Sequence, residues 1–261
     1  MATVTQHAPG TFCWPELATI DQGAAKKFYT GLFGWTFNDT DMGPQGVYTI
    51  FQSDGADVAA LYTMRDEERG LGPPHWNAYV SVESADRSAA KAKELGGTAI
   101  MEPFDVMEHG RMAILQDPTG AVFNLWEPKK NIGVGKIDEP NSLCWTELMT
   151  KDAAKAGDFY SKLLPWKPES MNMPDSPPYT IFKRGDASAG GMMQIQPEMG
   201  PVPPHWLSYF MVDDTDAKFA KAQELGASAL VPPTNIPDMG RFAILKDVQG
   251  AAFGIFGPEK K

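Results

Sequence analysis

The stretch DQGAAKKFYTGLFGW, residues 21–35, decides the architecture, because a close copy of it, DAAKAGDFYSKLLPW, occupies residues 152–166. The second copy begins 131 residues after the first. The apolar segments that precede the two copies, FCWPELAT (12–19) and LCWTELMT (143–150), match at the same spacing. Self-similarity over such a distance is typical of an internal repeat. We therefore expect a chain built by tandem duplication.

The remainder of the chain repeats at nearly the same spacing. PPHW stands at 73–76 and again at 203–206, and GRMAILQD (110–117) matches GRFAILKD (240–247), both offset by 130 residues. Around residues 127–142, Gly, Pro, Lys and Asp replace the periodic apolar residues, which is typical of a connection. We predict a first domain over 1–130, a linker over 131–141 and a second domain over 142–261.

Each repeat is predicted to contain two strand-helix-strand-strand units. Residues 12–19 have the apolar and β-branched composition of a strand. Asp21 is a suitable N-cap for a helix with an apolar stripe that ends at Gly34. In one of the two units, the third or fourth strand is only weakly indicated. Further strands are expected over 47–52, 57–63, 76–82, 98–103, 111–116 and 121–126, with a second helix over 85–95.

Composition excludes several classes of function. A net charge of -10 without a basic cluster disfavours nucleic-acid and anionic-membrane partners. No apolar window approaches the roughly 18 residues of a membrane span, and the N-terminus lacks a secretory pattern. We expect a cytoplasmic protein. Cys13 and Cys144 are too few for a disulfide framework and are expected to be small buried hydrophobic residues.

The repeated motifs resemble those of the vicinal oxygen chelate superfamily, the group of glyoxalases, bleomycin resistance proteins and extradiol dioxygenases. The resemblance is carried by D-x-x-x-A-x-x-F-Y-x-x-L-[FL]-[GP]-W at residues 21–35 and 152–166, and by D-x-x-G-A at 117–121 and 247–251. It implies an α+β fold with two glyoxalase-like domains. Each domain would contain paired βαβββ modules whose curled sheets form a cup.

The resemblance also implies where a divalent metal would bind. Superfamily ligands, commonly His, His and Glu, stand on the opening strand of each module and on the closing strand. Those positions are Trp14, Asn77 and Asn124 in the first repeat, and Trp145, Leu207 and Gly254 in the second. Trp, Leu and Gly side chains cannot donate to a metal ion, and Asn is a weak substitute. We predict no metal at these positions and no other cofactor.

Two glutamates are the candidate catalytic residues. Side chains two residues apart share a face of a strand, so Glu16 points into the cup with Trp14, and Glu147 with Trp145. A buried carboxyl group has a raised pKa and can act as a general base, with Arg111 and Arg241 as candidate counter-ions. A structural ion pair or a position at the rim of the cup is the alternative.

The histidines of the two PPHW motifs leave three alternatives open. His75 and His205 could join Glu16 and Glu147 in a displaced divalent-metal site, line a pocket without metal, or bond to the backbone of their own loop. Aromatic walls with a few polar groups are typical of a site for a flat organic ligand. The candidate ligand-binding residues are Trp14, His75, Asn77, Arg111, Asn124, Trp126, Trp145, His205 and Arg241.

The two cups are expected to differ. Asn77, Asn124 and Trp126 become Leu207, Gly254 and Phe256, so the N-terminal cup is the more polar one. The leading hypothesis is a small-molecule-binding protein that carries or sequesters an aromatic or polar metabolite or antibiotic. The alternatives are a lyase, isomerase or oxygenase of the superfamily, and an interaction protein with vestigial cups. Monomer and homodimer both remain open.

Overall fold

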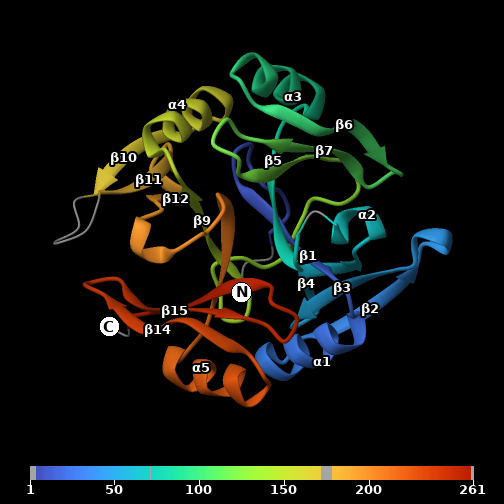
Figure 1. Cartoon of the computed structure of the whole chain (residues 1–261). Helices are drawn as coiled ribbons and strands as arrows, with labels where there is room; N and C mark the ends of the chain where they lie inside the picture. The colour runs from blue at the N-terminus through green and yellow to red at the C-terminus, as the bar shows by residue number, and fades with distance from the viewer. Residues whose placement is uncertain (1–3, 71, 172–177, 260–261) are drawn as a thin grey trace.

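Each repeat forms one eight-stranded sheet in the computed structural model, which describes residues 4–70, 72–171 and 178–259 (Figure 1). The strand orders are β2-β3-β4-β1-β5-β8-β7-β6 and β10-β11-β12-β9-β13-β16-β15-β14. The first sheet contains β1 (Phe12–Thr19), β2 (Thr36–Asp41), β3 (Val47–Ser53), β4 (Ala56–Thr63), β5 (His75–Ser81), β6 (Thr98–Val106), β7 (Gly110–Gln116) and β8 (Val122–Pro128). The second contains β9 (Leu143–Thr150), β10 (Lys167–Met171), β11 (Tyr179–Arg184), β12 (Ala187–Gln194), β13 (His205–Met211), β14 (Ser228–Ile236), β15 (Gly240–Lys246) and β16 (Ala252–Pro258).

Within a sheet, two βαβββ modules meet edge to edge at their opening strands. β1 pairs antiparallel with β5, and β9 pairs antiparallel with β13 in the same way. The closing strand of each module returns parallel to its opening strand, as β4 does to β1 and β8 does to β5. The predicted fold, a tandem repeat of paired βαβββ modules, is confirmed.

The helices follow the opening strands. Asp21 accepts a hydrogen bond from the Ala24 N–H, and Asp152 accepts one from the Lys155 N–H, so the repeated aspartate caps the first helix of each repeat. No helix among the described residues is long and apolar enough to span a membrane. The helices are α1 (Gln22–Phe33), α2 (Asp66–Arg69), α3 (Ala85–Glu94), α4 (Ala153–Leu163) and α5 (Thr215–Glu224).

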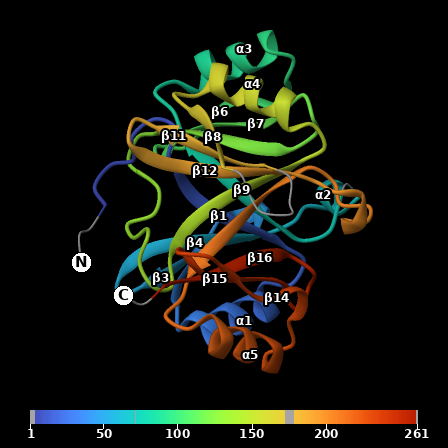
Figure 2. The ribbon, with the colours of Figure 1, turned by 90° about the vertical axis from the view of Figure 1, so that its left-hand side faces the viewer.

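Both large hydrophobic cores are shared between the repeats. Figures 1 and 2 show α1 beside α5 at one end of the molecule and α3 beside α4 at the other. The first of these cores joins the module of β1 to β4 to the module of β13 to β16, and the second joins the two remaining modules. Each repeat therefore buries its apolar helix faces against the other repeat.

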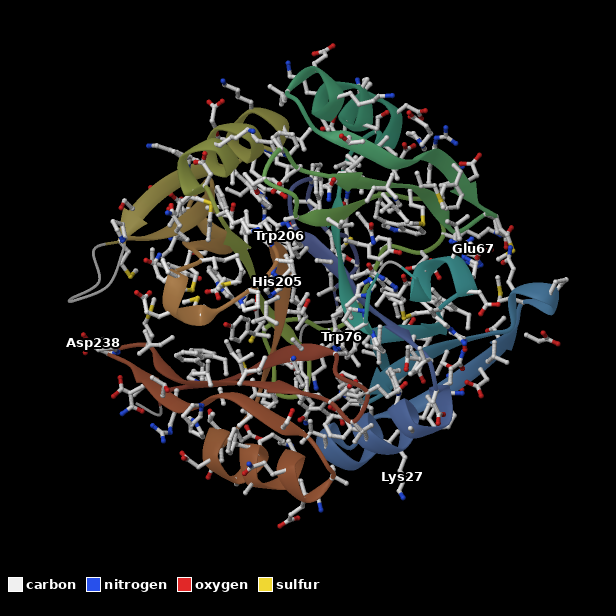
Figure 3. The ribbon with its side chains drawn as sticks, in the orientation of Figure 1. Lys27, Glu67, Trp76, His205, Trp206 and Asp238 are labelled. Atoms are coloured by element: carbon white, nitrogen blue, oxygen red, sulfur yellow. The ribbon has the colours of Figure 1, made fainter. Side chains whose placement is uncertain are left out.

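Two equivalent chains of buried hydrogen bonds cross between the repeats. The Tyr29 hydroxyl donates to Asp247 Oδ2 (3.0 Å) and accepts the Trp76 indole N–H (3.0 Å). In the other half, Tyr160 donates to Asp117 (3.0 Å) and accepts from Trp206 (2.9 Å). Trp76 and Trp206 lie in the middle of the molecule in Figure 3. The tryptophan of each PPHW motif is thus part of the hydrogen-bonded contact between the repeats.

In the first repeat the structure adds a strand outside the predicted ranges, and it is the second strand of its module, not the third or fourth. β2, with the sequence TFNDTD, lies at the sheet edge with every residue exposed, so it has no alternation of apolar and polar side chains. Its pairing with β3 supplies the order that its own composition does not.

Replacing Tyr29 with Phe should lower the free energy of unfolding by about 1–3 kcal/mol, because a buried Asp247 oxygen and the Trp76 N–H lose their partner. Tyr160→Phe should cost a similar amount, because it removes the equivalent bonds. Urea denaturation of the single variants and of Tyr29→Phe combined with Asp247→Asn measures the coupling. If the changes in the free energy of unfolding of the two substitutions are strictly additive, Tyr29 and Asp247 are not coupled, which would contradict this contact between the repeats.

Candidate functional site

A glutamate lies at the centre of the concave face of each sheet. Glu16 on β1 is only 7% exposed. The Tyr48 hydroxyl, from β3, donates to Glu16 Oε1 at 2.7 Å, and the Tyr79 hydroxyl, from β5, donates to Oε2 at 2.7 Å. The Trp14 indole N–H donates in turn to the Tyr48 oxygen at 3.1 Å. Two strands, β3 and β5, therefore supply the hydrogen bonds that compensate the burial of this carboxyl group, and the indole of Trp14 supports one of the two donors.

The second repeat contains the same network. Tyr179 donates to Glu147 Oε1 (2.7 Å), Tyr209 donates to Oε2 (3.1 Å), and the Trp145 indole donates to Tyr179 (2.9 Å). We call each set a Glu-Tyr-Tyr-Trp network: Glu16, Tyr48, Tyr79 and Trp14 in the N-terminal cup, and Glu147, Tyr179, Tyr209 and Trp145 in the C-terminal cup.

Burial dominates the protonation equilibrium of both glutamates. Desolvation raises the pKa of Glu16, the hydrogen bonds from Tyr48 and Tyr79 lower it by less, and the negative charge of Glu68 adds to the rise. The pKa of Glu147 is raised by burial in the same way and is lowered in part by Tyr179 and Tyr209. Each carboxyl group therefore keeps its proton to a higher pH than an exposed glutamate.

Strand register places the superfamily's ligand positions on this same face. Glu16 is directly opposite Asn77, Trp14 is opposite Tyr79, and Tyr79 is opposite Asn124. Residues opposite one another in register share a face, so Trp14, Asn77 and Asn124 all line the N-terminal cup. Trp126 joins them, two residues beyond Asn124 on β8.

Asn124 is the least satisfied group in this cup. Asn124 is only 1% exposed, and its side-chain Oδ1 atom has no hydrogen-bond partner among the described residues. Buried polar atoms are normally paired, and one without a partner is a candidate contact for a ligand.

The C-terminal cup fills the same volume differently. Gly254 stands in register with Tyr209, and a Cβ atom at Gly254 would overlap the Tyr209 ring. The aromatic ring thus occupies the space that an Asn124-like side chain would need. Leu207 and Phe256 replace Asn77 and Trp126, so the two cups share a network but differ in the polarity of their walls.

The side chains at the ligand positions do not fit a divalent cation. Trp14 and Trp145 have no lone pair to donate, and Leu207 and Gly254 carry no donor atom. Among residues 4–70, 72–171 and 178–259, no three His, Cys, Asp or Glu side chains converge as a metal site would require. A displaced site built on Glu16 and His75 also lacks its third ligand there.

Both PPHW histidines bond to their own loop. His75 Nδ1 lies 2.9 Å from the Pro73 carbonyl oxygen, and His205 Nδ1 lies 2.8 Å from that of Pro203. The structure therefore agrees with the alternative in which each histidine bonds to the backbone of its own loop, and the two residues lie at the start of β5 and β13. Whether either also touches a ligand stays a prediction.

The expectation that arginines neutralise the glutamates is wrong. Arg111 forms a bidentate pair with Asp86 (2.6 and 2.9 Å), and Arg241 pairs with Asp216 (2.7 and 3.0 Å). Each arginine holds the first turn of a helix, α3 or α5, against a neighbouring strand. The partners of Glu16 and Glu147 are instead neutral hydroxyl groups.

Sequence reasoning missed the four tyrosines of the networks. A signal was present, because YTIF recurs at 48–51 and 179–182 and Tyr79 matches Tyr209. Finding the partners of Glu16 required the register of β3 and β5 against β1.

Replacing Glu16 with Gln should improve stability relative to the wild type as pH rises. Because the folded-state pKa lies above the ordinary value of 4.5, the folded wild type holds a proton that the unfolded chain has lost, and its stability falls through that window. Glutamine does not titrate. Melting temperatures measured from about pH 4 to about pH 8 test this. A flat difference between variant and wild type would contradict the raised pKa, and Glu67→Gln, at an exposed residue of α2, is the control.

Comparison with known proteins identifies the family. The model of the Glyoxalase/Bleomycin resistance protein/Dioxygenase superfamily matches residues 11–125 and 142–255. "Putative glyoxylase CFP32" of Mycobacterium tuberculosis is 40% identical over 255 residues, which are 97% of each chain. "Anthracycline biosynthesis protein DnrV" of Streptomyces peucetius is 35% identical over 264 residues, which cover 97% of this chain and 94% of that one.

Solved structures show the same fold at low sequence identity. The 2,3-dioxygenase LapB from Pseudomonas sp. KL28 has a TM-score of 0.65 at 14% identity, with 100% of this chain and 94% of that chain covered. The Mn(II)-bound glyoxalase from Novosphingobium aromaticivorans has a TM-score of 0.66 at 15% identity, with coverage of 95% and 82%. The duplicated motifs, the paired βαβββ modules and the family match agree: the chain belongs to the Glyoxalase/Bleomycin resistance protein/Dioxygenase superfamily and carries two copies of its domain.

Proposed function

We propose that the N-terminal cup binds a compact aromatic molecule that carries a hydrogen-bond donor, without a metal ion at the superfamily's ligand positions. The observation that carries this proposal is Asn124 Oδ1, a buried acceptor without a partner among the described residues. Leaving such an atom unpaired costs about 1–3 kcal/mol. A ligand hydroxyl or N–H group directed at Asn124 recovers that free energy, which an apolar ligand cannot do.

The walls of the cup support an aromatic ligand. The rings of Tyr79 and Trp126 pack edge to face, with centroids 6.4 Å apart; Tyr79 is directly opposite Asn124 in the register, and Trp126 follows Asn124 by two residues on β8. Trp14 belongs to the same apolar cluster. Aromatic surfaces around a small number of polar groups favour flat ligands whose orientation is set by hydrogen bonds.

One end of the cup is more open than the other. Asn77 and Tyr62 are half-buried, and the Tyr62 hydroxyl lies 3.4 Å from Glu68 of α2. At the opposite end, linker residue Val134 packs against Trp14 and Trp126. We infer that a ligand enters beside α2 and contacts Asn77 on the way to Asn124.

Relatives support the class of ligand. Two proteins that are 35% identical to this chain are named for anthracycline biosynthesis. Anthracyclines contain fused planar rings with phenolic hydroxyl groups, and a phenol supplies both the flat surface and the donor that the cup requires. We therefore infer a hydroxylated planar aromatic molecule as the ligand.

An enzyme that uses Glu16 as general base is the second candidate. The observation that favours it is the raised pKa of this buried carboxyl group on the same face as Asn124, because a base works best when its pKa lies near the working pH. Binding and catalysis separate in Glu16→Gln. In a binding protein this variant alters affinity alone, whereas in an enzyme it abolishes turnover of a ligand that still binds.

Titration with phenol, 1-naphthol and 1-hydroxyanthraquinone, followed by tryptophan fluorescence and thermal shift, tests the binding function. At least one hydroxylated probe should bind, and its hydroxyl-free parent should bind more weakly. Asn124→Leu, which is similar in shape, should weaken binding by about tenfold or more through the lost hydrogen bond. The same variant should raise the melting temperature of the free protein, because it removes the unpaired acceptor.

Glu147→Gln in the C-terminal cup is the matched control and should leave the affinity unchanged. The proposal fails if no probe binds, or if the wild type and Asn124→Leu bind every probe equally well. Loss of affinity in Glu147→Gln, together with unchanged affinity in Asn124→Leu, would move the site to the C-terminal cup.

A further inference from the structure

The two cups differ at the end where the opening strand begins. In the N-terminal repeat, linker residues Val134 and Ile137 pack against the apolar cluster of the concave face. Trp14, Met112 and Trp126 are 5%, 8% and 7% exposed beneath them. Their counterparts Trp145, Phe242 and Phe256 are half-buried. Three large apolar side chains are thus partly uncovered in the second cup, at positions that the first cup covers.

The linker is held by backbone hydrogen bonds to a bulge. Cys13 is left out of the β1–β5 pairing between Phe12 and Trp14, and its carbonyl oxygen accepts the Val134 N–H at 2.8 Å. The Gly135 N–H donates to the Asp57 carbonyl oxygen at 2.8 Å. The segment therefore docks as an extended chain against the end of the sheet.

This docking mode demands a particular sequence. Gly133 has a φ of +109°, and a Cβ atom there would overlap the Cys13 carbonyl oxygen, so only glycine fits. The next residue, Val134, is completely buried in the apolar cluster. The linker thus presents a glycine followed by a β-branched residue.

The C-terminal repeat also contains the bulge that accepts the linker in the first repeat. Cys144 is also left out of its ladder by a bulge, between the pairs Trp145–Tyr209 and Leu143–Phe210. In the part of the chain that the structure describes, no loop N–H and no side chain donates to the carbonyl oxygens of Cys144 or Ser188, the counterparts of Cys13 and Asp57.

We propose that this open end of the C-terminal cup docks an extended segment of a partner protein that contains glycine followed by a β-branched residue. We call it the Cys144 surface. The chain's own linker, bound to the equivalent surface of the first repeat, is the template for the occupant. The residues of this surface are Cys144, Trp145, Ser188, Phe242 and Phe256.

The linker sequence itself is the probe. An acetylated and amidated peptide NIGVGKI, residues 131–137, is titrated into the full chain while NMR follows the assigned tryptophan indole N–H signals. The Trp145 signal should shift to saturation and the Trp14 signal should stay in place, because the covalent linker already covers Trp14. A peptide with the Gly133→Ala change should bind at least about tenfold more weakly.

Phe242→Ala in the full chain should weaken binding of the unaltered peptide, and the peptide comparison keeps the test valid if this variant is unstable. The proposal is overturned if the Trp145 signal does not move at millimolar peptide. It is also overturned if the Gly133→Ala peptide binds as well as the parent, or if Trp14 and Trp145 respond alike, which would indicate non-specific contact with tryptophan.

Discussion

The buried hydrogen bond between a tyrosine of one repeat and an aspartate of the other sets the arrangement of the whole molecule. Asp247 Oδ1 accepts the N–H groups of Gln249 and Ala251 and so forms its own turn, while Oδ2 accepts the Tyr29 hydroxyl. Asp117 and Tyr160 repeat this division of labour. One carboxylate therefore fixes both a local turn and the contact between repeats. The motifs that identify the family, F-Y and D-x-x-G-A, are the two partners of this bond.

The two large hydrophobic cores that join the repeats lie on the outer side of the curled sheets. The side chains of the concave faces are therefore not needed to hold the repeats together. Leu17 of β1 packs in one shared core, whereas Glu16 beside it points into the cup. A substitution in a cup therefore changes the polarity of the side chains that line it without changing the contact between the two repeats. This separation explains how Asn124 and Gly254 can occupy equivalent positions in one chain while the backbone topology of the two sheets stays the same.

The sequence predicted the fold well because its signals are local and doubled. The capping aspartates, the apolar stripe of α1 and the apolar composition of β1 each report short-range constraints, and the second copy repeats them. The parity argument that predicted Glu16 on the face of Trp14 also follows from local geometry, whereas the positions of Asn77 and Asn124 were expected from the resemblance to the superfamily. The partners of the glutamate do not, because Tyr48 lies 32 residues away and reaches Glu16 through two intervening pairings, β3 with β4 and β4 with β1. Arg111 was expected to be the counter-ion of Glu16. It forms a bidentate contact with Asp86 of α3 instead, which depends on the packing of the helix against β7 and is not visible in the sequence.

The duplication also allows the two cups to be compared position by position. A carboxyl group at the centre of the sheet needs compensation, and in both cups two phenols and an indole provide it through neutral hydrogen bonds. Neutral donors leave the charge of the glutamate unbalanced, so burial keeps its pKa raised in both copies. Since the centres are alike, any difference in what the cups bind must arise from their walls and their ends. In the N-terminal cup the wall offers an unpaired amide oxygen and the linker covers one end. In the C-terminal cup an aromatic ring occupies the place of the amide, and the end that the linker would cover presents a bulge carbonyl and half-buried aromatic rings.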